Sequence, residues 1–220
     1  MHDRMQYLRM IYTCLYEASV TGGTCVDPIF FHFPEDVIFT NTPGHNETFI
    51  VANAVKVSPV VGPQAPGQDF YLSHFPPGRF VNLADLSEVI EGKYNQQRLK
   101  YRNKVNAHLM PGMIIPFQNN SAMTARTTND LKRLPLSLII NRNQRDVAVG
   151  TVFLDGGNTY SEIENKTFEY YTIKHSGYNS TVKRSGAHSV QFLLSDGTRG
   201  TEDNAYNLTE IIIADAADLY

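Results

Sequence analysis

The first part of the chain has the hydrophobic pattern of a single amphipathic helix. From Arg4 to Ala18 apolar residues recur every three or four positions, which is the period of a helix with one buried face. The members of this stripe are Leu8, Ile11, Tyr12, Leu15 and Ala18. Asp3 with Gln6 suits the start of the helix. Gly22-Gly23 predicts its end, because glycine accepts the left-handed conformation that is common after a helix.

The next apolar run is short and aromatic. It extends from Asp27 to Pro34 and is bounded by prolines, a pattern typical of a short buried strand. A helix followed by a buried strand is the order of an α/β unit, but that order is not repeated further along the chain. The sequence therefore predicts one helix–strand unit at the start and a different architecture after it.

From Thr48 onward the pattern is one of strands separated by turns. β-branched residues with alternating apolar positions predict a strand from Phe49 to Val61. Turn residues at Pro76-Pro77-Gly78 and at Pro111-Gly112 predict two hairpins. The remaining expected strands are 70–75, 78–83, 105–109, 113–117, 136–140, 147–154, 167–174, 188–194 and 208–214. Their spacing is typical of antiparallel β-sandwiches.

Composition and charge narrow the class of protein. A chain of 220 residues with 42% hydrophobic residues is long enough for one large globular domain or two small ones. A net charge of −3 provides no concentrated positive field, so nucleic acid and anionic lipid are not expected partners. No apolar run reaches the length of a membrane span, and the first residues lack the pattern of a signal peptide.

Two sequence features bear on the compartment. Cys14 and Cys25 are the only cysteines, and they lack the paired Cys-x-x-Cys spacing of a zinc or redox motif. Two buried thiols are the expectation, and a disulfide in an oxidising compartment is the alternative. Asn-x-Ser/Thr acceptors number five, against about two expected by chance, which weakly favours secretory exposure. They begin at Asn46, Asn119, Asn165, Asn179 and Asn207.

No self-contained nucleophile or metal site is expected. The sequence has no Gly-x-Ser-x-Gly elbow, and Cys14 lies within the helical stripe, where a core role is expected. The histidines are scattered singly, without the spacing of a metal motif, so we expect satisfied or surface imidazoles. They are His2, His32, His45, His74, His108, His175 and His188.

Acidic residues offer no defined active site either. Glycoside hydrolysis needs two carboxyl groups at a controlled separation, and two neighbouring pairs qualify by sequence alone. These are Asp85 with Glu88 and Glu162 with Glu164, and each pair lies in a segment expected to be a solvated loop. Asp155-Gly156-Gly157 lacks the spaced oxygen ligands of a calcium loop and is expected to be a β-turn.

Five blocks of sequence nevertheless carry a family resemblance. They are 7–34, 49–60, 75–83, 105–116 and 152–157, which include Pro28-Ile29-Phe30-Phe31-His32-Phe33-Pro34 and Phe153-Leu154-Asp155-Gly156. Taken in this order, they resemble glycoside hydrolase family 31, the family of lysosomal and intestinal α-glucosidases. The resemblance spans roughly residues 4 to 175 and corresponds to the C-terminal portion of the family only.

The resemblance implies a mainly β fold. It assigns residues 1–57 to the C-terminal end of an incomplete TIM (β/α)8 barrel, with its last helix and strand. It assigns 58–140 to a proximal antiparallel β-sandwich and 141–220 to a distal β-domain. The family's nucleophile and acid/base are aspartates upstream of the matched stretch. No catalytic, cofactor-binding or metal-binding residue is therefore expected in this chain.

The function implied is that of a supporting part of a retaining α-glucosidase-like hydrolase. The chain would close and buttress the barrel and be inactive alone, so whether it is itself an enzyme stays open. Its expected partner is the N-terminal barrel of the parent chain, whose substrate is an α-glucoside or oligosaccharide in a lysosomal or secreted location. Two alternatives are a stand-alone carbohydrate-binding β-sandwich, with Tyr170 and Tyr171 as its platform, and an inert truncated copy.

The sequence also departs from the family pattern. Ala52-Asn53 stands where the family usually has Gly followed by an acidic residue, and Phe80 lies near a usual Trp. Met110 stands in place of Arg, and Gly156 in place of a second Asp. Together these departures indicate a divergent lineage.

Overall fold

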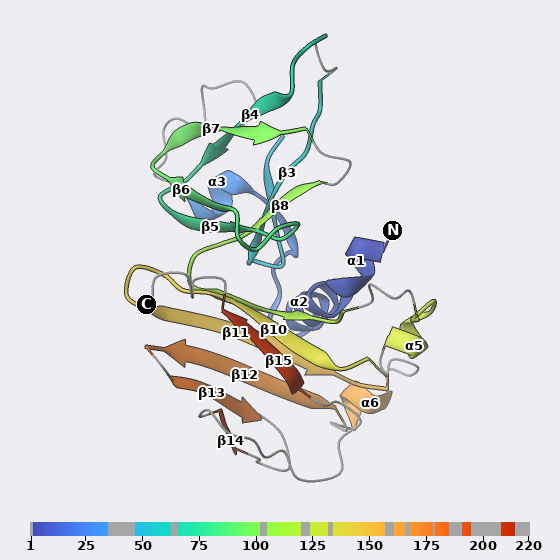
Figure 1. Ribbon diagram of the computed structural model, residues 1–220. Helices are drawn as coiled ribbons and strands as arrows, with labels where there is room; N and C mark the ends of the chain where they lie inside the picture. The colour runs from blue at the N-terminus through green and yellow to red at the C-terminus, as the bar shows by residue number, and fades with distance from the viewer. Residues whose placement is uncertain are drawn as a thin grey trace. The chain divides into compact units, whose positions relative to one another are not determined.

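The protein is mainly β, with few helices (Figure 1). The computed structural model describes residues 2–34, 47–62, 66–101, 105–119, 124–131, 134–156, 161–165, 168–177, 179–184, 191–194 and 208–213. The chain forms two compact units. Unit 1 comprises Met1–Gly22 with Gly112–Tyr220, and unit 2 comprises Gly23–Pro111. The mainly β prediction is confirmed, whereas the boundaries expected near residues 57 and 140 stay a prediction.

Unit 1 contains a seven-stranded sheet with the strand order β14-β13-β12-β11-β9-β10-β15. In chain order the strands are β9 (Met113–Phe117), β10 (Leu136–Asn141), β11 (Val147–Leu154), β12 (Glu169–Ser176), β13 (Asn179–Arg184), β14 (Gln191–Leu194) and β15 (Leu208–Ile213). Neighbours pair antiparallel except β10 with β15 and β9 with β11, which are parallel. The sequence predicted each of these strands except β13. Two short helices, α5 (Thr128–Leu131) and α6 (Ser161–Glu164), lie between strands.

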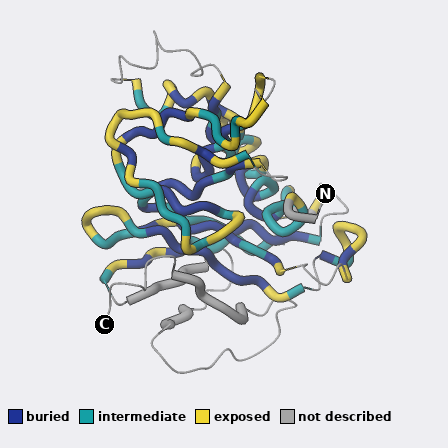
Figure 2. The backbone as a smooth tube through the Cα atoms, turned by 45° about the horizontal axis from the view of Figure 1, so that its top comes forward, coloured by how far each residue is buried: buried dark blue, intermediate teal, exposed yellow. Residues whose placement is uncertain are grey.

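The core of unit 1 lies on this sheet. All six residues of β10 are buried, since the strand has a neighbour on each side (Figure 2). One face carries Leu136, Leu138 and Ile140, and the other carries Ile139 between two buried polar residues. Alternate residues of β9 to β12 form one hydrophobic cluster, as the two-residue period of a strand requires. Its members are Ile114, Leu136, Leu138, Ile140, Ala148, Val152, Leu154 and Ile173.

The N-terminal helix of unit 1 is confirmed, but its predicted buried face is wrong. α1 (His2–Gln6) and α2 (Leu8–Thr21) are separated at Tyr7, so Asp3 lies inside α1 and is not at the N-cap of the long helix, which is Tyr7. Gly22 ends α2 with a φ of 80°. The buried residues of α2 are Arg9, Met10, Thr13 and Cys14, whereas Leu15 is 55% exposed. The burial differs from the apolar stripe because polar Thr13 contacts the sheet, where its Oγ1 accepts the N–H of Phe153 at 3.0 Å.

Unit 2 consists of two antiparallel sheets, one of six strands and one of two (Figure 1). The larger has the order β1-β2-β3-β8-β5-β6, and the smaller pairs β4 with β7. The strands are β1 (Val26–Pro28), β2 (Phe49–Val51), β3 (Val55–Ser58), β4 (Phe70–Phe75), β5 (Gly78–Asn82), β6 (Val89–Gly92), β7 (Asn95–Lys100) and β8 (Asn106–Leu109). We call the β4–β7 pair the ribbon.

The ribbon covers one face of the six-stranded sheet. The ring of Phe75 on β4 lies edge-on to Phe80 of β5 and to His108 of β8, with centroid distances of 5.2 and 5.1 Å. All three residues are buried. Their contacts form a second hydrophobic layer and give unit 2 its own interior.

Two predicted elements of unit 2 differ from the structure. The expected strand from Asp27 to Pro34 begins in β1 but continues as a short helix, α3 (Ile29–His32), of which only Ile29 is buried. Short apolar runs of this length do not distinguish strand from helix. The expected single strand from Phe49 is the hairpin of β2 and β3, which turns at Ala52 and Asn53 with φ of 50° and 55°.

The two predicted hairpins at prolines are also wrong. β4 pairs with β7 and not with β5 across Pro76-Pro77-Gly78, and β8 and β9 on either side of Pro111-Gly112 belong to different sheets. Proline lacks an N–H for a ladder, so these turns move the chain from one sheet to another. The sequence did not predict β6 or β7. The β7 sequence Asn-Gln-Gln-Arg-Leu-Lys is mostly polar and lacks the alternation of a half-buried strand.

Candidate functional site

A cluster of amine and hydroxyl groups surrounds Lys56 in the interior of unit 2. Lys56 Nζ donates to Ser58 Oγ at 2.6 Å and to Ser73 Oγ at 3.0 Å. Ser73 Oγ in turn donates to Ser58 Oγ at 2.9 Å. Nζ also lies 3.8 Å from the centroid of the Phe75 ring. We call Lys56, Ser58, Ser73 and Phe75 the Lys56 cluster.

Strand alternation and sheet packing together assemble the cluster. Lys56 and Ser58 are two apart on β3, so their side chains leave the same face of the larger sheet. Ser73 and Phe75 are likewise two apart on β4 and face the larger sheet from the ribbon. The pattern Val55-Lys56-Val57-Ser58 predicts a solvent face for the polar positions. The ribbon reverses that expectation by covering them.

Burial dominates the electrostatics of the cluster. Lys56 has 0% exposure, and this desolvation lowers its pKa well below that of an ordinary lysine, since a charged ammonium loses hydration in the interior. Next to it, Tyr71 Oη donates to Ser58 O and accepts from Asn106 Nδ2 at 2.8 Å. Burial raises the pKa of Tyr71, the main effect there. The interior therefore favours uncharged forms of both groups.

The Lys56 cluster has the groups of a serine–lysine nucleophile but not the access. A neutral amine beside a hydroxyl is the arrangement that activates serine in some acyl-transfer enzymes. A substrate carbonyl must reach the serine Oγ, yet Ser58 is 1% exposed and Ser73 is 6% exposed. The structure therefore supports an internal polar network at this position. No sequence motif identified it, and a lysine inside a β-branched strand was the available signal.

Four histidines, His32, His74, His108 and His175, have described side chains. His74, His108 and His175 are buried at 4%, 0% and 2% exposure, while His32 Nε2 lies 3.2 Å from Asp27 Oδ2. Among residues that the structure describes, no group of three metal-ligating side chains comes together. His45 and His188 lie outside the described residues, as does the side chain of His2.

The acidic candidates have local partners. Asp85 Oδ1 accepts the N–H and hydroxyl of Ser87, at 3.1 and 2.6 Å, while Glu88 Oε2 accepts from Asn82 Nδ2 at 2.8 Å. Both interactions organise the turn between β5 and β6. The Glu162 side chain lies outside the described residues, so the second pair is untested.

The Asp155 segment is tied to the helix of unit 1. Asp155 Oδ2 accepts the hydroxyl of Tyr12 at 2.7 Å, directly after β11. This contact joins α2 to the end of the strand and accounts for a buried carboxylate there. Gly157, the last residue of the expected turn, lies outside the described residues.

The two tyrosines of the carbohydrate-binding alternative are engaged within unit 1. Tyr170 donates to Glu17 Oε1 at 2.6 Å, an oxygen that also accepts from Thr151 Oγ1 at 2.6 Å. Burial, with the Glu17 hydrogen bond, raises the pKa of Tyr170 to about 12. Tyr171 packs against the hydrophobic cluster and donates to Glu169 Oε2. Neither ring is an open stacking platform.

The structure describes both cysteines and some of the Asn-x-Ser/Thr acceptors, the two sequence features that concern the compartment. Both cysteines are disulfide-bonded, so the expectation of two buried thiols is wrong. Asn119 and Asn165 are exposed acceptor positions. Asn46, Asn207 and the side chain of Asn179 lie outside the described residues.

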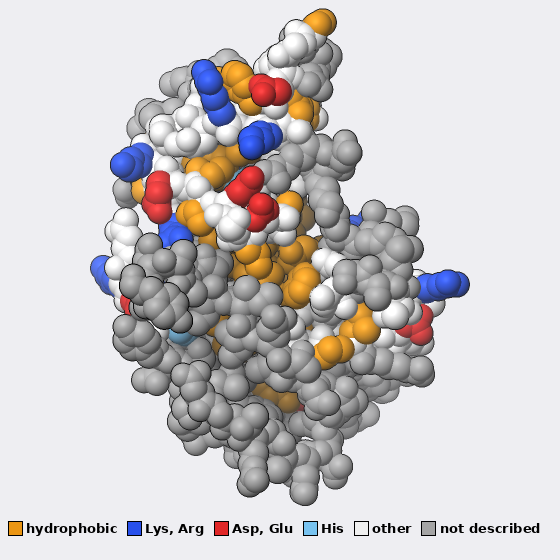
Figure 3. Space-filling view, viewed as in Figure 1, with side chains coloured by type: hydrophobic (Ala, Val, Ile, Leu, Met, Phe, Trp, Pro, Cys, Tyr) orange, Lys and Arg blue, Asp and Glu red, His pale blue; other side chains and the backbone are white. Residues whose placement is uncertain are grey.

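The surface shows no field of one charge sign in the described part of the face seen in Figure 3, where basic and acidic side chains are interspersed. In the described segments, no helix combines the length and the apolar character that crossing a membrane requires.

Comparisons with known proteins connect this fold to glycosidases. No protein-family model matches the chain. Among curated proteins, the α-glucosidase of Hordeum vulgare is 34% identical over 158 residues, which are 71% of this chain and 17% of the relative. A probable α-glucosidase of Oryza sativa subsp. japonica is 30% identical over 85% of the chain and 20% of its own length. Alpha-xylosidase 1 of Arabidopsis thaliana is 29% identical over 88% and 21%.

Solved structures share the fold. A glucosidase II α subunit superimposes with a TM-score of 0.75 at 15% identity, over 96% of this chain and 22% of that one. A glycoside hydrolase family 31 dextranase of Flavobacterium johnsoniae gives a TM-score of 0.69 at 18% identity, over 85% and 23%. The chain thus spans about a fifth of the length of the curated relatives above. By sequence and fold together, the chain belongs to glycoside hydrolase family 31 and corresponds to a C-terminal portion of its members.

Proposed function

We propose that the chain acts as the C-terminal part of a retaining α-glucosidase-like hydrolase that cleaves terminal α-glucosidic bonds. In this proposal residues 1–57 complete the catalytic (β/α)8 barrel, and the β-sandwiches of 58–140 and 141–220 support it. The two catalytic aspartates are supplied by an N-terminal barrel portion, so the chain is inactive by itself. The α-glucosidases among its relatives, each several times longer, support this assignment.

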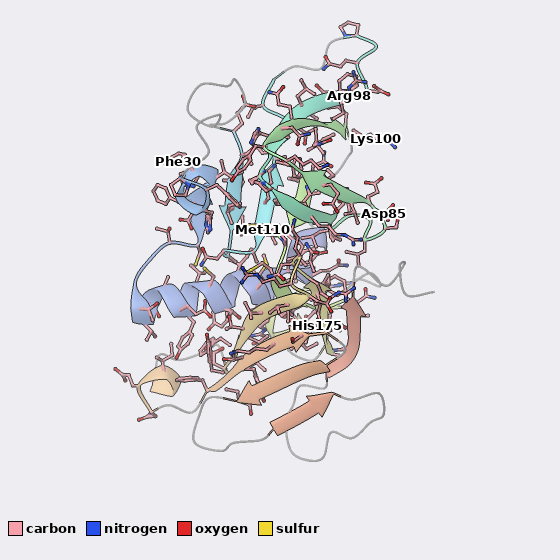
Figure 4. The ribbon with its side chains drawn as sticks, turned by 90° about the vertical axis from the view of Figure 1, so that its left-hand side faces the viewer. Phe30, Asp85, Arg98, Lys100, Met110 and His175 are labelled. Carbon is pink, nitrogen blue, oxygen red and sulfur yellow. The ribbon has the colours of Figure 1, made fainter. Side chains whose placement is uncertain are left out.

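An exposed aromatic surface at the start of unit 2 carries the proposal. Phe30 is 46% exposed and Phe31 64% exposed, and their rings contact edge to face at 5.1 Å. Val26 on the neighbouring edge strand β1 is 59% exposed. Figure 4 shows Phe30 projecting outward from α3. Adjacent large apolar side chains in solvent mark an interaction surface, and here they lie in the segment assigned to the barrel end.

The exposed phenylalanines are held in a defined position. His32 lies within hydrogen-bonding distance of buried Asp27, and the Phe33 N–H donates to Ile29 O at 3.2 Å. Buried Ile29 anchors the same helix. A fixed aromatic pair loses little conformational entropy on docking. This supports a permanent apolar partner, for which the barrel portion of the parent polypeptide is the proposed occupant.

A secreted or lysosomal location fits the same proposal. The cysteines are disulfide-bonded, which requires an oxidising compartment. The exposed acceptors Asn119 and Asn165 suit proteins that pass through the secretory pathway.

Activity and association test the proposal together. The 220-residue chain is assayed for hydrolysis of a chromogenic α-glucoside, and no turnover is expected; turnover by the chain alone would overturn the proposal. Without a barrel, the chain is expected to self-associate through its aromatic surface in analytical ultracentrifugation. The double change Phe30→Ser and Phe31→Ser should reduce association, whereas Val149→Ser, at an exposed apolar position on β11, should not. The mass of the native protein then shows whether the barrel portion is present.

The carbohydrate-binding alternative has less support, because Tyr170 and Tyr171 are hydrogen-bonded and packed within unit 1. A glycan array with the same chain tests it directly. Retention of glycans that is abolished by Tyr170→Ala would favour the alternative.

A further inference from the structure

Lysine is ordinarily a cation, but no carboxylate among the described residues contacts the Lys56 amine. Its Nζ contacts two hydroxyl oxygens and an aromatic ring. Within the part of unit 2 that the structure describes, it makes no ion pair. A lysine that is fully buried and unpaired with an anion is held more stably as the neutral amine than as ammonium.

The elements packed around Lys56 bring few titratable groups. On β8, His108 is the residue paired with Lys56 across the ladder, and its ring contacts Phe75. On β4 the facing groups are Ser73, Phe75 and the phenol of Tyr71. Towards β2 the ladder partner is Ile50.

Further residues complete the interior. β5 contributes Phe80 and β7 contributes Leu99, both apolar and buried. None of the groups named on these elements is a carboxylate that could compensate an ammonium charge.

We propose that Lys56 is a proton-linked latch between the two sheets of unit 2: the closed ribbon buries its amine without an anion, and proton uptake by the exposed amine stabilises the open ribbon. The geometry links these two events. Nζ joins β3 to Ser73 and Phe75 on β4, so water reaches Nζ only when the ribbon leaves the larger sheet. Hydrated Lys56 then takes up a proton as any exposed lysine does.

The sign of the effect follows from the two states. The open unit binds a proton on Lys56 up to the ordinary lysine pKa of about 10.4, while the closed unit does not. The closed state is therefore stabilised as pH rises and destabilised as pH falls. One proton changes the opening equilibrium by at most about tenfold per pH unit.

Amine labelling of the wild-type chain measures this latch. An acylating reagent is applied at limiting concentration, and the modification of Lys56 and Lys100 is read by peptide mass spectrometry. Lys100 is exposed on β7 of the ribbon (Figure 4) and is the internal reference for reagent reactivity. The ratio of Lys56 to Lys100 labelling should rise up to about tenfold per pH unit as pH falls from 9.5 to 7.5. A ratio that is constant, or that falls, overturns the proposal.

A matched pair of variants adds an independent measurement. Hydrogen exchange of β3 and β4 peptides, corrected for intrinsic rates, should show opening that increases at lower pH in wild type and in Lys100→Met. In Lys56→Met the pH dependence should disappear, while Ser58 and Ser73 keep their mutual hydrogen bond. Persistence of the wild-type slope in Lys56→Met contradicts the latch. If that variant fails to fold, the labelling ratio in wild type decides. This inference does not depend on the proposed glycosidase role.

Discussion

Replacing Phe153 by alanine tests how unit 1 is held together. Phe153 on β11 has 0% exposure and its ring stacks on Tyr16 of α2 with centroids 3.7 Å apart. It also contacts Tyr12 at 5.7 Å and Phe168 at 5.2 Å. One ring therefore connects the long helix, β11 and the residue preceding β12.

The expected cost follows from that packing. Truncation of a fully buried Phe to Ala typically destabilises by about 3–5 kcal/mol, through lost burial and the cavity left behind. We place Phe153→Ala in this range. For a chain of this size the change corresponds to roughly 6–20 °C in the melting temperature of unit 1, at about 2–4 °C per kcal/mol. The stacked pair with Tyr16 should account for about 0.5–1.5 kcal/mol in a double-mutant cycle with Tyr16→Leu.

Leu15→Ala is the control within unit 1, since it truncates an apolar side chain of α2 that is 55% exposed. Its effect on unfolding should stay within about 0.5 kcal/mol. Both variants are compared with wild type by urea unfolding followed by far-ultraviolet circular dichroism. The packing argument is refuted if Phe153→Ala costs less than about 1 kcal/mol, or if the two variants are equally destabilised.

Three further changes have defined outcomes. Gly150→Ala should destabilise unit 1 by about 1–3 kcal/mol in urea unfolding, because an added Cβ would lie 2.2 Å from the Ile114 carbonyl oxygen. The control Gly62→Ala should leave stability nearly unchanged, because an added Cβ there meets no atom within 4 Å. Ala52→Gly should stabilise unit 2 by about 1 kcal/mol in thermal melts, because Ala52 has a φ of 50°. The pKa of Tyr170 is raised to about 12, so the stability that its protonated phenol contributes to unit 1 is complete below pH 10 and is lost as pH rises from 10 towards 12. In alkaline denaturation, Tyr170→Phe should lack this loss of stability. No gain in Ala52→Gly would contradict the assigned turn, and an unchanged alkaline loss in Tyr170→Phe would assign it to another group.

Local patterns in the sequence predicted much of the secondary structure. The period of the first helix, the glycines that end it, and the strands β9 to β12 follow from short-range pattern and turn chemistry. The family resemblance leads us to expect Gly at position 52. The structure explains that preference, because the turn there requires a positive φ, which glycine adopts without strain. These features depend on residues that are close in the chain.

Pairing and burial were decided by tertiary structure. The prolines at 76, 77 and 111 mark turns, but which strand lies next to which depends on contacts between distant segments. The helix face against β11 is likewise chosen by Thr13 and its contact with Phe153, and not by the apolar stripe. Short-range periodicity carries no information about such partners.

The Lys56 cluster shows the same limit for a candidate site. From the sequence alone, Lys56 in β3 is a polar residue on the solvent side of an alternating strand. In the folded unit it is fully buried, because Ser73 and Phe75, nearly twenty residues away, arrive from the ribbon and cover it. The sequence by itself determined that β3 has one apolar and one polar face. Only the second layer decided that the polar face would be interior, since whether a charge meets water or protein depends on what packs over it.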